Sequence, residues 1–163
     1  MSFVTSIYTM LDSTMLGFLS TDIQIGYYSA ANKLNHMVLS ILTALTAVLL
    51  PRLTVYAANE QKNKFDELAR KSFSMMLLLS IPMATGLFLL AKPLTLIFSG
   101  SEYLPAVLPM QIITPIVCAI PLASITASQV LPALNKEKLA LISYVIASLL
   151  NIACNFIFIP QEL

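Results

Sequence analysis

The sequence predicts an all-α protein, a polytopic transmembrane helix bundle of about five spans that forms one domain over residues 1–163. Two observations lead to this fold class. Hydrophobic residues make up 58% of the chain and charged residues only 10%, whereas soluble domains average about 25% charged residues. The hydrophobic residues also lie in blocks long enough to cross a bilayer, so an integral membrane protein is predicted.

The first predicted hairpin joins a span over residues 2–19 to a span over residues 24–50. Between the spans lies a short polar break that ends at Asp22, a residue type that caps helix N-termini. Asp12 lies well inside the first apolar run and Lys33 well inside the second. A charged side chain at membrane depth is costly, so it usually has a partner or a function.

Asp12 and Lys33 are predicted to lie at the same depth. Each is about ten or eleven residues from the break, which is roughly 15 Å and therefore near the middle of a hydrocarbon core about 30 Å thick. Polar stripes at helical spacing accompany them and must face protein or water. They contain Thr5 and Tyr8 in the first span and Ser29, His36, Ser40 and Thr43 in the second.

These stripes predict a substrate or ion pathway along the first hairpin. The residues predicted to line it are Asp12, Lys33, His36, Ser29, Ser40 and Tyr8. Asp12 and Lys33 are predicted to face each other on the cavity side. The alternative is that they form a structural ion pair that merely joins two helices.

The third span is predicted over residues 72–98, after a hydrophilic connection over residues 59–71. The connection carries an apolar stripe at helical spacing, which predicts an amphipathic helix lying at the membrane interface. A solvated loop is the alternative. The fourth span, over residues 102–131, contains Pro105, Pro109, Pro115 and Pro121. Prolines free helical carbonyls, so this span is either a bent helix that lines a pathway or a kinked packing helix.

The fifth span is predicted over residues 139–158. Basic residues are concentrated in the connections after the second and fourth spans, and the opposite side has only Lys92 near a span end. Because cytoplasmic loops are enriched in Lys and Arg, both basic connections and the N-terminus are predicted to be cytoplasmic.

The residues give no sign of an enzyme, a cofactor or a metal site. The formal net charge of +1 does not suggest nucleic-acid binding. His36 is the single histidine and no clustered acidic pair accompanies it, so no catalytic residue is predicted. A single histidine is more often a polar packing residue than a functional one, although the usual pKa of histidine permits proton coupling at His36. Cys118 and Cys154 lie in apolar runs without Cys-x-x-Cys spacing and are interpreted as packing residues.

Several short segments match a known family in the same order. They are DSTMLG from Asp12, IGYYSAANK from Ile25, LPR from Leu50, FSGSEY from Phe98 and QVLPALNKEK from Gln129. No segment is specific alone, but the ordered set covers almost the whole chain. It resembles the start of the second half of bacterial lipid-linked oligosaccharide flippases, which are the O-antigen and capsular repeat-unit transporters of the multidrug/oligosaccharidyl-lipid/polysaccharide exporter superfamily.

The resemblance implies a transporter in the bacterial cytoplasmic membrane. It would flip undecaprenyl-linked oligosaccharide repeat units for cell-surface polysaccharide biosynthesis, with H+ or Na+ as the candidate coupling ion. Such flippases have two bundles of about six helices, so the chain is expected to be a fragment that lacks the first bundle and cannot flip lipid-linked sugars alone. The alternatives are a multidrug exporter of the same superfamily and a non-transporting membrane scaffold or truncated remnant.

Overall fold

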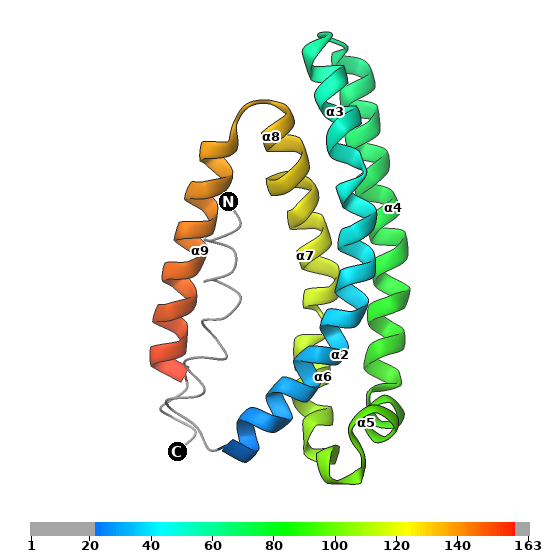
Figure 1. Cartoon of the computed structure of the whole chain (residues 1–163), viewed down its shortest axis with the longest axis vertical. Coiled ribbons are helices and arrows are strands. Elements are labelled where there is room, and N and C mark those ends of the chain that lie inside the picture. Colours follow the sequence, from blue (N-terminus) through cyan, green and yellow to red (C-terminus); the bar gives the residue numbers. More distant parts are fainter. Residues whose placement is uncertain (1–21, 159–163) are drawn as a thin grey trace.

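The structure is a computed structural model that describes residues 22–158, with side chains described over residues 23–150 (Figure 1). The regular structure in this part of the chain is entirely helical. The helices are α2 (Asp22–Ala47), α3 (Leu49–Ala58), α4 (Lys62–Leu89), α5 (Ala91–Ser99), η1 (Ser101–Ala106), α6 (Val107–Ile113), α7 (Ile116–Ser124), η2 (Ile125–Val130), α8 (Leu131–Ala133) and α9 (Glu137–Phe158). Of these, η1 is a 3-10 helix and η2 a π-helix.

Three helical stretches in the described residues are long and apolar enough to cross a membrane: Ile23–Ala58, Lys62–Leu89 and Ile116–Ala133. The first combines α2 with α3, which are separated by one turn residue, Val48. The predicted all-α membrane bundle is therefore confirmed as the fold class. The number of spans stays a prediction, because the one expected over residues 2–19 lies outside the described residues.

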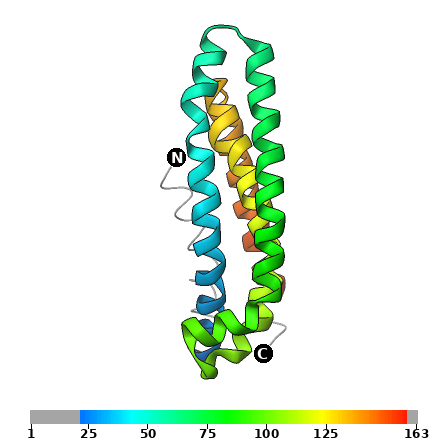
Figure 2. The ribbon, with the colours of Figure 1, turned by 90° about the vertical axis from the view of Figure 1, so that its right-hand side faces the viewer.

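The core lies where three rods of helix meet. α2–α3 and α4 form an antiparallel hairpin, and the rod made of α6, α7 and η2 packs against both (Figures 1 and 2). Leu42, Met110, Val117 and Ile125 are fully buried at this junction. These are apolar side chains at helical spacing, so the burial of one stripe on each rod builds the core.

The fourth predicted span is one rod of short helical segments rather than a single helix. Proline has no N–H to donate, and the rod turns at Thr114–Pro115 and widens into the π-helix η2 four residues after Pro121. One face is buried along the rod, at Met110, Thr114, Val117, Pro121, Ile125, Gln129 and Ala133. Because α6, α7 and η2 contact both α2 and α4, these contacts favour the packing interpretation for this face.

The third predicted span has the wrong end point. It was expected to reach residue 98, but α4 ends at Leu89. Pro93 lies in the first turn of α5 and cannot donate a hydrogen bond to the Leu89 carbonyl, so the helical ladder stops there. α5 then runs across the end of the bundle (Figure 2). This change of direction brings Phe98 and Ser99 to α2.

The connection predicted as an amphipathic helix is helical from Lys62 onward, so the solvated-loop alternative is wrong for residues 62–71. It does not lie flat at an interface, however. It continues the axis of α4 beside α3 (Figure 1). Phe65 is 7% exposed and belongs to a small core with Leu53 of α3 and Ala133 of α8. Because neighbouring helices cover the apolar stripe, the segment runs beside α3 in line with the rest of α4.

Both basic connections lie at the same end of the bundle. The α3–α4 and α8–α9 turns are at the top of Figure 1, whereas α5 and η1 are at the bottom. We call these the basic end and the α5 end. Lys62, Lys64, Lys136 and Lys138 lie at or next to the two turns of the basic end, and Arg52, Arg70 and Lys71 lie further along α3 and α4. The arrangement suits the positive-inside rule, while the side that faces the cytoplasm stays a prediction.

Candidate functional site

The polar stripe predicted on the second span lies on the exposed side of α2. Ser29, Lys33, His36 and Ser40 are all exposed, at spacings of four and three residues that place them on one helix face. Among residues 23–150 the one ion pair joins two exposed residues of α4, far along the chain from this stripe. Lys33 therefore has no carboxylate partner within the described side chains.

Two predicted site residues, Asp12 and Tyr8, lie outside the described residues. Their pairing and their position relative to Lys33 stay predictions. Lys33 shares a hollow with Phe98 and Ser99 at the end of α5. The first turns of α2 lean outward in Figure 1, and the depth of Lys33 in a membrane stays a prediction.

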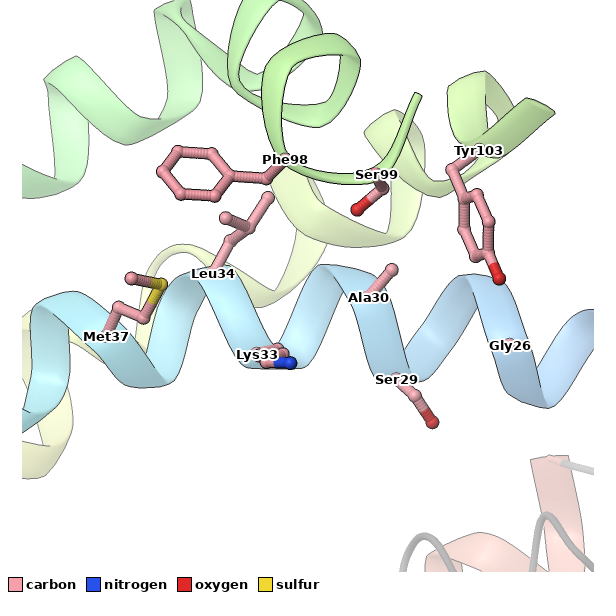
Figure 3. Close-up of a pocket in the computed structure, with 9 residues that line it drawn as sticks. All are labelled: Gly26, Ser29, Ala30, Lys33, Leu34, Met37, Phe98, Ser99 and Tyr103. Carbon is pink, nitrogen blue, oxygen red and sulfur yellow. The ribbon is translucent and has the colours of Figure 1, made fainter. Parts of the chain in front are cut away.

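The hollow around Lys33 has a volume of about 500 Å³ and opens between α2, α5 and η1. We call it the lysine hollow. Its polar groups come from Ser29, Lys33, Ser99 and Tyr103, and its apolar wall includes Leu34, Met37 and Phe98. In Figure 3 the hydroxyl groups of Ser99 and Tyr103 point toward α2 from the α5–η1 turn. One cation and several hydroxyl groups beside an apolar wall can hold an anionic group attached to a lipid.

A second hollow of about 530 Å³ adjoins the first at the same end of the bundle. It is lined by Ile23, Gly26, Tyr27, Glu102 and Tyr103. We call it the tyrosine hollow. The rings of Tyr27 and Tyr103 meet edge to face, with centroids 5.8 Å apart and an interplanar angle of 88°. This contact ties η1 to the first turns of α2.

Sequence reasoning missed the residues that α5 and η1 contribute. Ser99 and Tyr103 belong to the segment FSGSEY, which the sequence assigned only to a turn and the start of a span. Gly100, which follows α5, has φ 88°, a conformation that glycine adopts without strain. The chain reverses at this glycine, so the two residues face α2. The local sequence predicts such a turn but not which helix it meets.

Sequence reasoning also missed a polar residue on the packed side of α2. Asn35 is 0% exposed, and its Nδ2 donates hydrogen bonds to the Ala31 carbonyl at 3.0 Å and to the Met110 carbonyl of α6 at 3.4 Å. Its Oδ1 has no hydrogen-bond partner among the described atoms. Asn35 thus joins α2 to α6 inside the core and does not reach the lysine hollow.

Comparison with known proteins identifies the family. A family profile with the description "Polysaccharide biosynthesis protein" matches residues 1–108 of the 163-residue chain. The chain belongs to this family. The match includes α2, α5 and all of η1, so both hollows lie within it. Together with the long apolar helices, it makes this polysaccharide biosynthesis protein a multi-pass membrane protein.

A curated relative is the "Probable lipid II flippase MurJ" of Bdellovibrio bacteriovorus. The two sequences are 41% identical over 71 residues, which is 43% of this chain and 14% of the relative. The aligned part is thus a small fraction of that protein's length. No solved structure matches the chain.

Proposed function

We propose that this polysaccharide biosynthesis protein is part of a flippase rather than an enzyme, and that the complete flippase moves undecaprenyl-linked oligosaccharide repeat units across the bacterial cytoplasmic membrane. The family and the printed name of the relative support a lipid-linked substrate. The structural observation that most supports the proposal is that Lys33 is an exposed cation in a hollow with an apolar wall. A cation within an apolar helix bundle is by default a functional residue.

The chemistry of the lysine hollow suits such a substrate. A lipid-linked saccharide has an apolar tail, an anionic linkage and a hydroxyl-rich head. Lys33 can form a charge-assisted hydrogen bond to the linkage, while Met37 and Phe98 lie beside it as apolar contacts. Ser29 and Ser99 also line the hollow, although their hydroxyl groups lie on different sides of α2 in Figure 3. The polar stripe continues from Lys33 to His36 and Ser40 as the proposed path along α2.

The remaining parts of the transporter follow from the same proposal. Asp12 and Tyr8 would line the path from the first hairpin helix. His36 would bind and release the proton if the coupling ion is H+ rather than Na+. Alternating access requires a second bundle that rocks against this one. With the basic end in the cytoplasm, as the positive-inside rule favours, the N-terminus is cytoplasmic and the α5 end faces outward.

Replacing Lys33 tests the proposal directly. The chain is purified in lipid nanodiscs, and binding of undecaprenyl diphosphate is measured by native mass spectrometry against undecaprenol, which lacks the anion. We expect Lys33→Gln to weaken binding of the diphosphate about tenfold or more, because a hydrogen bond to a charged group contributes roughly 1.5–3 kcal/mol. Undecaprenol binding should not change.

Lys92→Gln is the matched control. Lys92 is an exposed lysine of α5 at the same end of the bundle, but it does not line the lysine hollow. This variant should bind undecaprenyl diphosphate as the unaltered chain does. Equal losses in the two variants would mean that only the overall charge of this end attracts the anion, and the assignment of Lys33 would be wrong.

A further inference from the structure

We propose that the tyrosine hollow is a carbohydrate subsite, which holds the first sugar of a lipid-linked saccharide whose anionic linkage lies at Lys33. The inference rests on the proposed function and deepens it by assigning a separate place to the sugar. The two hollows meet at shared residues. Gly26 and Tyr103 line both of them, so one ligand can occupy both hollows by passing these two residues.

Gly26 keeps the passage between the hollows open. A Cβ atom at this position would lie 4.0 Å from Cε1 of Tyr103, which is ordinary van der Waals contact. An alanine therefore fits, but a longer side chain would extend into the space that the two hollows share. The ring of Tyr103 stands over a stretch of α2 that presents backbone rather than a side chain.

The charges of the two hollows favour opposite ends of one ligand. Of the described residues, those lining the lysine hollow include a cation and no carboxylate, whereas those lining the tyrosine hollow include Glu102 and no cation. An anionic linkage is attracted to the first and repelled by the second. A neutral sugar has no such penalty, and its hydroxyl groups can donate hydrogen bonds to the Glu102 carboxylate.

The tyrosine pair supplies the second feature of a carbohydrate site. The face of an aromatic ring carries partial negative charge, so it attracts the weakly positive C–H groups of a sugar ring. Tyr27 and Tyr103 are both half-buried and hold each other edge to face at 5.8 Å. Their mutual contact fixes the ring orientations before a ligand arrives, which reduces the entropy lost on binding.

The distance between Gly26 and Lys33 requires an extended ligand. Gly26 and Lys33 are seven residues apart on α2, which is about 10 Å along the helix axis. A single small anion cannot contact both ends of this span. A molecule with an anion at one end and a sugar ring at the other can do so, and its sugar then lies toward the α5 end, past Tyr103.

The test compares two probes, undecaprenyl diphosphate and undecaprenyl-diphosphate-N-acetylglucosamine, on the full chain in nanodiscs by native mass spectrometry. The unaltered chain should bind the sugar-bearing lipid at least fivefold more tightly. Tyr27→Ala and Glu102→Gln change residues that line the tyrosine hollow but not the lysine hollow. Each should reduce this ratio to near one, while affinity for the sugar-free lipid stays within twofold. Tyr27→Phe keeps the ring and should keep most of the ratio.

Tyr144→Ala is the matched control, because Tyr144 is a half-buried tyrosine of α9 that lines neither hollow. Retained affinity for the sugar-free lipid shows that each variant is folded. If Tyr27→Ala and Glu102→Gln keep the full sugar preference, the subsite is refuted. If the unaltered chain binds both probes equally, the subsite fails while the lysine hollow stands. If it binds neither probe, the proposed function itself fails and the subsite with it.

Discussion

The two sides of α2 both carry polar residues, but they differ in what those residues contact. On the packed side, Asn35 and Thr46 are 0% exposed and hydrogen-bond across to other helices. On the other side, Lys33 and His36 are exposed. Polar residues in one membrane helix can therefore have two roles. Those on the packed side join helices, and those on the exposed side are available to a ligand or to a part of the protein outside the described residues.

The packed side can use polar groups because each one is largely satisfied locally. The Thr46 hydroxyl donates to the Thr43 carbonyl at 2.7 Å and lies 3.4 Å from the Ser124 hydroxyl of α7. Amide and hydroxyl groups remain neutral, so their burial costs far less than that of an ammonium group. A lysine at either position would be buried without a counter-charge. The side of α2 on which Lys33 lies is therefore fixed by the cost of burying its charge.

Of the changes that test this comparison, Asn35→Asp should have the largest effect on the free energy of unfolding. It replaces the donating amide by a carboxyl group next to the Ala31 and Met110 carbonyls, which destabilises the fold by roughly 3 kcal/mol. Asn35→Leu removes the amide and fills a similar volume, so it should change stability by less than about 1 kcal/mol. Unfolding in detergent, followed by helical circular dichroism, measures both. Similar losses for Asp and Leu would mean that shape, not hydrogen bonding, dominates at this position.

Thr46→Val should have a smaller effect. It keeps the shape of the side chain but removes the weak contact with Ser124, and hydrogen bonds between membrane helices average about 0.6 kcal/mol. Thr54→Val is the control, because Thr54 is exposed and bonds only its own helix at Leu50. The same unfolding measurement should rank Thr46→Val as more destabilising than Thr54→Val. The reverse order would mean that Thr46 does not help to join α2 to α7.

Lys33→Gln and His36→Gln should have the smallest effect on stability. Both residues are exposed and lack an ion pair within the described side chains, so unfolding should shift by no more than about 0.5 kcal/mol. The same Lys33→Gln protein should bind undecaprenyl diphosphate poorly. A large loss of stability for either variant would instead place that residue in a structural contact, as the ion-pair alternative for Asp12 and Lys33 predicts.

The sequence by itself determined the fold class, because an apolar chain with few charges can satisfy its backbone within a membrane only as helices or a closed barrel. It also determined the exposed stripe from Ser29 to Ser40, since a helical period fixes which residues share a face. The concentration of basic residues in two connections was visible in the same way. These features depend on local spacing and composition alone.

Only the tertiary structure decided which polar residues are buried and where the hollows form. Asn35 lies two positions from Lys33, and no local rule separates an amide that joins α6 from one that faces outward. The end of α4 at Leu89 was missed because proline-containing membrane helices often continue, and here α5 turns across the bundle instead. Ser99 and Tyr103 reach α2 across about seventy residues of sequence, since helix packing brings together faces that are distant in the chain.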